Sequence, residues 1–360
     1  MSGPKKSRPS SGRATVKTIS ESAGVAASTV SRALRGDPRI SQETRERIAK
    51  IAHSAGYTPN ALAAGLVTRR SGVIGLVVGR LENPFYAELI ERLHEVLAAR
   101  GKRAMVLHVG GTALDEETMR AVLKYQMDGC VIAAAPLDST AAAICDQAGL
   151  PMVMINRVAR VHSSAVSCDN QAGGRRLGEL LIGGGHRRIA FVAGRADTST
   201  SEQRMRGLGE ALATAGLSRF AMVRGSYSYD SGFSAARNLV SGTIRPDAIF
   251  AANDIMACGV IDALRTLEIA VPDEISVVGF DDIRPARWAS YRLTTIAQPM
   301  ERMVDRALDL LDQRLGDPSL PGEDVQIPGA LKIRDSARLP SGMARDAGEE
   351  MPATAIVPAD

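Results

Sequence analysis

Short apolar runs alternate with amphipathic helical patterns through most of this 360-residue chain, from position 73 onward. Two of the helical patterns cover residues 86–100 and 201–215. Such alternation over more than 200 residues predicts doubly wound α/β sheets with parallel strands. The strands are too many for one lobe, so we expect two. The runs that predict strands are residues 73–78, 104–109, 130–134, 152–155, 189–192, 248–251 and 276–280.

Polar residues follow five of these runs at the point where each predicted strand ends. Ligands of open α/β sheets bind in the crevice beyond the carboxyl ends of the strands. The sequence therefore predicts a ligand-binding cleft built from these segments. They are residues 79–86, 156–157, 193–204, 251–254 and 279–282.

Positive charge is concentrated at the N-terminal end of the chain. Residues 1–70 contain 13 Lys and Arg against 4 Asp and Glu, whereas the remaining residues contain 31 against 36. A basic end on an acidic body indicates that the first segment meets a polyanion and that the rest does not. The alternative is a solvated basic tail.

Residues 15–34 read as two short helices joined by a tight turn. Thr15 is a suitable cap for the first helix, and Gly24 supplies the backbone freedom that the turn requires. The second helix, over residues 27–34, is expected to direct Val30 and Leu34 inward. Its outward side chains, short polar groups and one arginine, suit a helix that lies in a DNA major groove. They are Ser28, Thr29 and Arg32.

A third helix is expected to begin after Ser41, a good N-cap, with Glu43 in its first turn. Its apolar face would close a small three-helix core, with Tyr57 packed beneath it. The core residues on that face are Ile48, Ile51 and Ala52. A generic helical hairpin is the alternative for a lone turn of this kind, but the whole 44-residue pattern favours the helix-turn-helix.

Residues 15–70 resemble the DNA-binding headpiece of the LacI-type (lactose and purine repressor) family. The matching text is AGV-x3-TVSRAL, SQETRERI and GYTPNALAAGL. Later strings resemble the periplasmic-binding-protein-like core of the same family, so the resemblance covers residues 15–337. These strings are GLVVGRLENPFYAELIE, GHRRIAFVAG, AIFAANDIMACG, VPDEISVVGFDDI and LTTIAQP.

The resemblance implies an α-helical helix-turn-helix headpiece joined to an α/β two-lobed sensor domain with doubly wound parallel sheets. It implies a homodimeric transcriptional repressor that binds a pseudo-palindromic operator in double-stranded DNA. A small-molecule effector would control operator affinity allosterically.

The headpiece residues that the resemblance places on DNA include the exposed positions of the second helix. Ala26 departs from the family, which usually has a serine cap there, and loss of a cap costs about 1 kcal/mol. Small Ala27 reads little beyond a thymine methyl, so Arg32 and Ser28 are expected to carry the direct readout. The DNA-binding set in the headpiece is Thr15, Lys17, Ala27, Ser28, Thr29 and Arg32.

Residues 60–72 resemble the hinge helix and linker of the family. A helix this short is marginal in water, so it is expected to fold only on a partner hinge and on DNA. The resemblance implies contacts from Asn60 and Ala63 and a wedge at Leu66 between base pairs of the minor groove. Alternatively, Leu66 is a linker leucine that packs on the body.

The resemblance also implies a set of effector contacts that suit a sugar or sugar derivative, with polar groups for hydroxyls and flat aromatic faces. Alternatives stay open at several positions, since Asn253 and Asp254 could cap a helix, Phe85 could be core and Arg204 could be surface. The set is Phe85, Tyr86, Asn156, Thr198, Thr200, Arg204, Tyr227, Asn253, Asp254 and Asp281.

Other classes of protein fit the sequence less well. GxxxxGK[ST], GxSxG and HExxH are absent, so we expect neither an enzyme, such as one that processes sugars, nor a cofactor or metal. A solute-binding protein of the periplasmic type would need an export signal and no headpiece. Four widely spaced cysteines indicate reduced, mostly buried thiols of a cytoplasmic protein. They are Cys130, Cys145, Cys168 and Cys258. No run of about 18 apolar residues occurs, so we expect no membrane span.

These observations divide the chain into five parts. Residues 1–14 form a disordered basic tail, and residues 15–59 form the headpiece. The hinge and linker cover 60–72 and the effector-binding and dimerisation domain covers 73–337. Residues 338–360 form a flexible tail without heptads.

Overall fold

The computed structural model describes residues 14–57, 70–79, 81–109, 116–133, 139–157, 164–196, 198–217 and 221–346, apart from the side chains of residues 139–142. The chain divides into two compact units, with the boundary between Ser71 and Gly72. The expected hinge contacts Asn60, Ala63 and Leu66 lie outside the described residues, as do nearly all of the N-terminal tail and residues 347–360.

The first unit is a three-helix domain. Thr15 caps its first helix through a capping box with Thr18, and Gly24 ends that helix with a left-handed φ of 65°. Ser41 accepts from the Thr44 amide at the start of the third helix. Both caps and the turn glycine were predicted from the sequence. The helices are α1 (Val16–Ala23), α2 (Ala27–Leu34) and α3 (Gln42–Ser54).

A small apolar core holds the three helices together. Ile19, Val30 and Ile48 are each 0% exposed and contribute one large side chain from each helix. The inward position expected for Leu34 is only partly correct. Ala33 is the second buried residue of α2, while Leu34 is half-buried at the last position of the helix.

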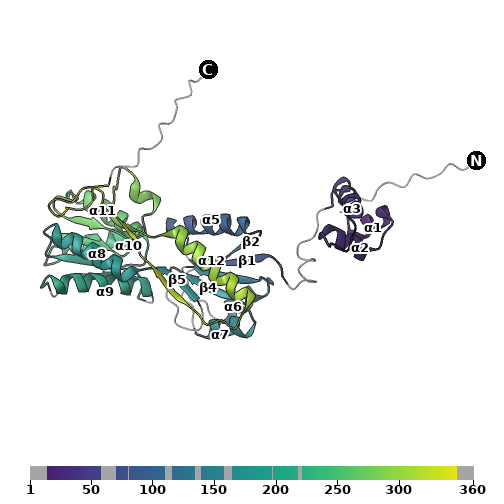
Figure 1. Ribbon diagram of the computed structural model, residues 1–360. Helices are drawn as coiled ribbons and strands as arrows, with labels where there is room; N and C mark the ends of the chain where they lie inside the picture. The colour runs from purple at the N-terminus through teal and green to yellow at the C-terminus, as the bar shows by residue number, and fades with distance from the viewer. Residues whose placement is uncertain are drawn as a thin grey trace, which may run out of the picture. The chain divides into compact units, whose positions relative to one another are not determined.

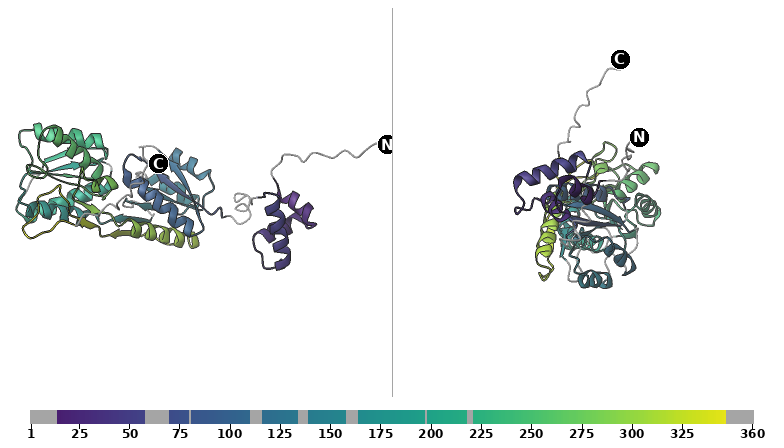
Figure 2. Two further views of the ribbon diagram at one scale, coloured as in Figure 1. Left: turned by 90° about the horizontal axis from the view of Figure 1, so that it is seen from above. Right: turned by 90° about the vertical axis from the view of Figure 1, so that its right-hand side faces the viewer.

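The second unit consists of two α/β lobes, as the number of apolar runs predicted (Figures 1 and 2). The N-lobe contains a six-stranded sheet of order β11-β5-β4-β3-β1-β2, and all its strand pairs are parallel. Its elements are β1 (Val73–Val78), α5 (Pro84–Ala99), β2 (Arg103–His108), α6 (Glu116–Leu123), β3 (Gly129–Ala133), α7 (Ser139–Gln147), β4 (Met152–Ile155), β5 (Ser164–Cys168), α12 (Met300–Gly316) and β11 (Asp324–Ile327).

The C-lobe contains a four-stranded parallel sheet of order β7-β6-β8-β9. Helices α8 and α9 pack together, as do α10 and α11. Its elements are α8 (Asn170–Gly183), β6 (Ile189–Ala193), α9 (Ser199–Thr214), β7 (Ala221–Arg224), α10 (Tyr229–Ser241), β8 (Ala248–Ala251), α11 (Asp254–Thr266), β9 (Ser276–Val278) and the 3-10 helix η1 (Arg284–Arg287).

The chain passes between the lobes at several points. It enters the C-lobe between β5 and α8, and returns to the N-lobe between β10 (Thr295–Ala297) and α12. After β11 it goes back to form β12 (Ala330–Lys332), which pairs antiparallel with β10. Residues on these connections therefore contact both lobes.

The predicted strands agree closely with the observed ones, and all seven apolar runs form strands. The bounds of β1, β4 and β8 are those predicted, whereas β9 ends two residues early. The sequence reading missed β5, because its buried Ser164 and Ser167 interrupt the apolar pattern. Strand β7, whose residues are largely exposed, was not predicted either, nor were β10, β11 and β12.

All four cysteines are free thiols and are buried, as expected. Burial raises the pKa of Cys168 to about 12 and that of Cys145 to about 11, so both are held as unreactive thiols. No helix within the described ranges is long and apolar enough to cross a membrane.

Candidate functional site

Helix α2 of the first unit presents a small polar surface. Ala27, Ser28 and Arg32 are exposed, whereas Thr29 is half-buried. The N-cap of the helix, Ala26, makes no side-chain capping hydrogen bond. Lys17 is exposed on α1. A short helix that exposes alanine, serine and arginine has the dimensions and donors needed to enter a major groove.

A pocket of about 650 Å³, including its part open to solvent, lies where the carboxyl ends of the strands of both lobes meet. The N-lobe contributes residues that follow β1 and β4, and the C-lobe contributes residues that follow β6, β7, β8 and β9. The lining residues are Glu82, Asn83, Tyr86, Asn156, Arg157, Arg195, Thr198, Thr200, Arg204, Ser226, Tyr227, Asn253 and Asp281.

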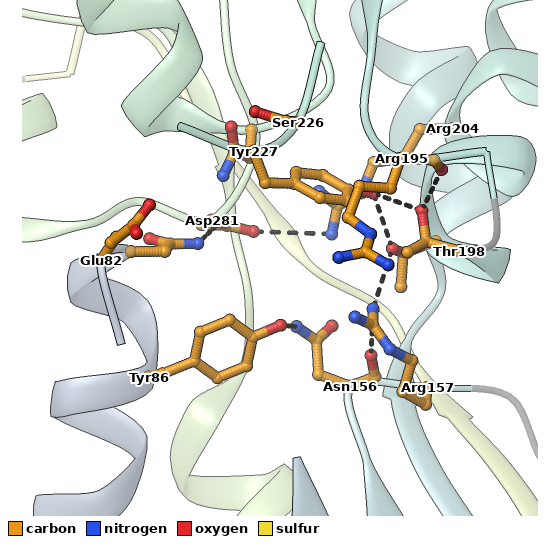
Figure 3. Close-up of a pocket in the computed structure, with 13 residues that line it drawn as sticks. Glu82, Tyr86, Asn156, Arg157, Arg195, Thr198, Arg204, Ser226, Tyr227 and Asp281 are labelled. Carbon is orange, nitrogen blue, oxygen red and sulfur yellow. Dashed lines mark hydrogen bonds and ion pairs between the residues drawn. The ribbon is translucent and has the colours of Figure 1, made fainter. Parts of the chain in front are cut away.

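Asp281 is the buried carboxylate of this pocket. Its Oδ1 accepts from Gln298 Nε2 at 2.7 Å, and its Oδ2 accepts from Asn83 Nδ2 at 3.3 Å. Arg204 Nη2 lies 3.5 Å from Oδ1 (Figure 3). Burial raises the pKa of Asp281 above its ordinary value, while the Arg204 charge and these hydrogen bonds oppose that shift.

Arg204 is held in one orientation by neighbours on every side. Its Nε donates to Asn170 Oδ1 at 2.8 Å, and its Nη1 donates to the carbonyl of Ala252. The guanidinium lies 3.7 Å from the centre of the Phe280 ring. The side chain is therefore a preorganised donor in the pocket wall, and the surface alternative for Arg204 is wrong because only 2% of the residue is exposed.

Tyr227 forms another part of the wall. Its hydroxyl lies 3.0 Å from Thr198 Oγ1 and 3.1 Å from Thr200 Oγ1 (Figure 3). Its φ of 63° is left-handed, a strained conformation for a non-glycine residue. A Cβ at Gly194 would lie 2.1 Å from the Tyr227 ring, so a larger residue there would displace that ring.

Two buried side-chain amide atoms in the wall have no hydrogen-bond partner among the described residues. They are Oδ1 of Asn156, an acceptor on the N-lobe side, and Nδ2 of Asn253, a donor on the C-lobe side. The other amide atom of each is engaged, since Asn156 Nδ2 donates to Tyr86 Oη at 3.4 Å and Asn253 Oδ1 accepts from the Met256 amide at 3.2 Å. Both atoms line the pocket, where a polar ligand can pair with them.

Eight of the ten expected effector residues line the pocket. Asn253 both lines it and caps α11, so its two alternative roles coexist. The eight are Tyr86, Asn156, Thr198, Thr200, Arg204, Tyr227, Asn253 and Asp281.

Phe85 and Asp254 do not line the pocket, and their expected placement is wrong. Phe85 is 1% exposed and packs edge-on against Tyr86 in the core, because adjacent residues of a helix point in different directions. Asp254 is fully buried, and its oxygens accept from Thr295 Oγ1 at 2.6 Å and from the Ile283 amide at 3.0 Å. Burial, with the nearby Asp281 charge, raises the pKa of Asp254 to about 8.

The sequence reading did not assign five residues that line the pocket. Four of them lie in polar segments that had already been placed after strands, but neither the resemblance nor the spacing said which side chains point inward. Ser226 follows β7, a strand that was not predicted from the sequence. The five are Glu82, Asn83, Arg157, Arg195 and Ser226.

Two family models match the chain. The model of bacterial regulatory proteins of the lacI family matches residues 15–60, and a periplasmic binding protein-like domain matches residues 179–337. The HTH-type transcriptional regulator CelR of Thermobifida fusca is 33% identical over 335 residues, which cover 90% of this chain and 98% of the relative. The ribose operon repressor of Escherichia coli is 32% identical, over 90% of this chain and 100% of the relative.

Solved structures agree with these relatives. A complex of the transcriptional regulator CelR with cellobiose is 31% identical, with a TM-score of 0.68, and covers 90% of this chain and 100% of its own. The lac repressor dimer bound to operator and the anti-inducer ONPF is 25% identical, with a TM-score of 0.82, over 90% of this chain and 99% of its own. With a matching headpiece, a matching two-lobed body and relatives of nearly equal length, this chain belongs to the lacI family of bacterial regulatory proteins.

Proposed function

We propose that this protein is a transcriptional repressor that binds a specific operator through its first unit and responds to a sugar or sugar derivative in the interlobe pocket. The observation that carries the effector half is the pair of unsatisfied amide atoms in the pocket wall, on Asn156 and Asn253. Membership of a family of regulators, together with the exposed face of α2, supports the DNA half.

The DNA contact proposed for α2 divides into reading and positioning. Arg32 is the side chain with the reach and the donor fork to pair with a guanine edge, and Ser28 can bond to either edge of a base pair. Lys17 and Thr15, at the start of α1, are proposed to contact phosphate, which sets affinity without reading sequence. Ala26 makes no capping hydrogen bond and Ala27 has only a small side chain, so base reading would depend mainly on Arg32.

The effector proposed for the pocket is rich in hydroxyl groups. A hydroxyl can donate to Asn156 Oδ1 and another can accept from Asn253 Nδ2, which would satisfy both unpaired atoms. Asp281 and Arg204 offer a buried acceptor and donors, and Tyr86 and Tyr227 offer apolar ring faces. CelR in complex with cellobiose, and a repressor named for the ribose operon, are relatives consistent with this class of ligand.

We further propose that the protein acts as a homodimer whose two headpieces read half-sites of a pseudo-palindrome. The lac repressor, a structural relative, is a dimer bound to operator. The effector would change operator affinity by a factor of roughly 5–150, the usual range of allosteric coupling.

A thermal-shift screen of sugars, sugar acids and nucleosides tests the effector half. Ligand that binds only the native state raises the melting temperature by mass action. A compound that raises the melting temperature of wild type should not raise that of Asn253→Ala, because this variant lacks the unpaired donor. If no polyhydroxylated compound shifts the melting temperature, or if every hit shifts Asn253→Ala equally, the proposed pocket ligand is wrong.

A further inference from the structure

The Asp281 carboxylate connects the C-lobe to the first residues of two long N-lobe helices. Asn83, which donates to Oδ2, is the N-cap of α5, and its own Oδ1 accepts from the Phe85 amide at 3.1 Å. Gln298, which donates to Oδ1, directly precedes Pro299, the N-cap of α12. Asn83, Gln298 and Asp281 are each 7% exposed. One buried carboxylate therefore receives one amide donor from the start of each helix.

The same two helices are joined at the other end of α5. Arg100, the C-cap of α5, forms ion pairs with Asp309 at 2.8 Å and with Asp312 at 2.9 Å, both on α12. Lys102 also pairs with Asp312. Helices α5 and α12 contact each other directly, and Figure 1 shows them side by side. They form a linked pair, which we call the α5–α12 unit.

A second connection crosses between the lobes just outside the pocket. Arg284, in η1, makes two contacts with α5. Its backbone amide donates to Glu88 Oε1 at 3.3 Å, and its side-chain Nη2 lies 3.2 Å from Glu91 Oε2. Both glutamates belong to α5. The Arg284 side chain is 70% exposed, so its ion pairs add little energy beside the buried Asn83–Asp281 bond. The first half of α5 thus contacts the segment from Asp281 to Arg284 through Asn83 at its cap and through Glu88 and Glu91.

We propose that Asn83 is a positioning residue that couples the Asp281 carboxylate to the α5–α12 unit, so that the N-lobe senses what binds to Asp281. The inference rests on the proposed function, because it takes Asp281 as an effector contact. A carboxylate offers about four acceptor positions. Gln298 and Arg204 engage Oδ1, whereas Oδ2 carries the Asn83 bond.

An effector hydroxyl that donates to Oδ2 therefore shares that oxygen with Asn83. Its arrival changes the bond to α5 and leaves the bond to Gln298 in place. The start of α5 moves relative to the C-lobe, and the ion pairs of Arg100 carry that movement to α12.

Hydrogen exchange of the full chain without ligand tests the coupling through Asn83→Ser. Serine caps helices about as well as asparagine, so α5 keeps its cap and only the donor to Asp281 is lost. We expect exchange of residues 281–284, in the other lobe, to become roughly tenfold faster, as for loss of a hydrogen bond to a charged group. Asp169→Ser, the same kind of change at the cap of α8, is the matched control and should leave residues 281–284 unchanged.

A residue that only caps α5 would alter exchange near residues 84–88 and nowhere else. That result, or no change at all, would overturn the proposal. Trp288 offers a second readout, because it is the one tryptophan of the sequence, directly follows η1 and is 58% exposed. Quenching of its fluorescence by acrylamide should differ between wild type and Asn83→Ser. Arg284→Ala should affect only the surroundings of residue 284. The quenching of Trp288 changes, whereas exchange at residues 84–88 stays as in wild type.

The two proposals fail in different ways. Exchange and quenching without ligand test the Asn83 connection whether or not any sugar binds. Titration with ribose and with cellobiose tests the effector. If neither these sugars nor the wider screen shifts wild-type melting, the proposed function fails while the ligand-free coupling can still hold. If a sugar binds and protects residues 84–88 equally in wild type and Asn83→Ser, the coupling is wrong and the effector stands.

Discussion

Asp281→Asn should destabilise the two-lobed unit, with a penalty that depends on pH. The carboxylate accepts from Gln298 at 2.7 Å and Asn83 at 3.3 Å, and lies 3.5 Å from Arg204. An asparagine of the same shape keeps one acceptor oxygen and turns an NH₂ group toward one of these donors. Loss of one hydrogen bond to a charged group costs about 2–3 kcal/mol. The melting temperature should fall by roughly 4–12 °C.

The pH dependence follows from the raised pKa of Asp254. Its value of about 8 arises first from burial and then from the Asp281 charge. A carboxyl whose pKa rises from 3.8 to about 8 on folding adds stability below 3.8 and loses it progressively as pH increases toward 8. The raised pKa of Asp281 itself acts in the same direction.

Asp281→Asn removes the contribution of Asp281 and reduces that of Asp254, because the pKa of Asp254 falls when the neighbouring charge is gone while burial still raises it. Wild type should therefore lose more stability than the variant as pH rises from about 4 to 8, and the penalty of the substitution should shrink. Scanning calorimetry of the two proteins across that interval measures the difference. A penalty that is constant or grows with pH would refute the coupling between the two carboxyls.

Other predictions concern the headpiece and the hinge. Arg32→Ala should cost ~1–3 kcal/mol at the preferred base and relax site preference in a selection from random DNA, and an unchanged consensus would contradict its reading role. Lys17→Ala should weaken all sequences equally and lower the slope of log affinity against log salt by about 1. Ile48→Ala should cost ~2–5 kcal/mol and abolish operator binding while the sugar response of the two-lobed unit persists. Leu66→Ala should reduce DNA bending in a gel-mobility assay, and unchanged bending would argue against a wedge.

The strands could be predicted where burial on both faces gives an uninterrupted apolar run. Val73–Val78 and Ala248–Ala251 are of this kind, and both formed strands with the predicted bounds. Ser164–Cys168 is equally buried, but its two serines resemble loop chemistry when read in sequence. Its position becomes clear only through its pairing with β4 and β11, which is a long-range contact.

The location of the pocket could be predicted more reliably than the set of side chains that line it. The carboxyl ends of the strands fix where the post-strand segments gather, and most lining residues come from those segments. Which side chains point inward depends on backbone conformation. Asn156, Tyr227 and Asp281 have φ values of 57°, 63° and 131°, and left-handed or otherwise positive φ reorients a side chain without leaving a regular sequence pattern.

Fluorescence anisotropy with an operator selected from random DNA tests the central proposal most directly. Saturation with a sugar that shifts wild-type melting should change the operator affinity of wild type by roughly 5–150-fold. Asn253→Ala should bind the same operator with wild-type affinity and respond little, because its headpiece is intact and the unpaired pocket donor is gone. Operator affinity that is identical with and without the bound sugar would contradict a sensor in the interlobe pocket.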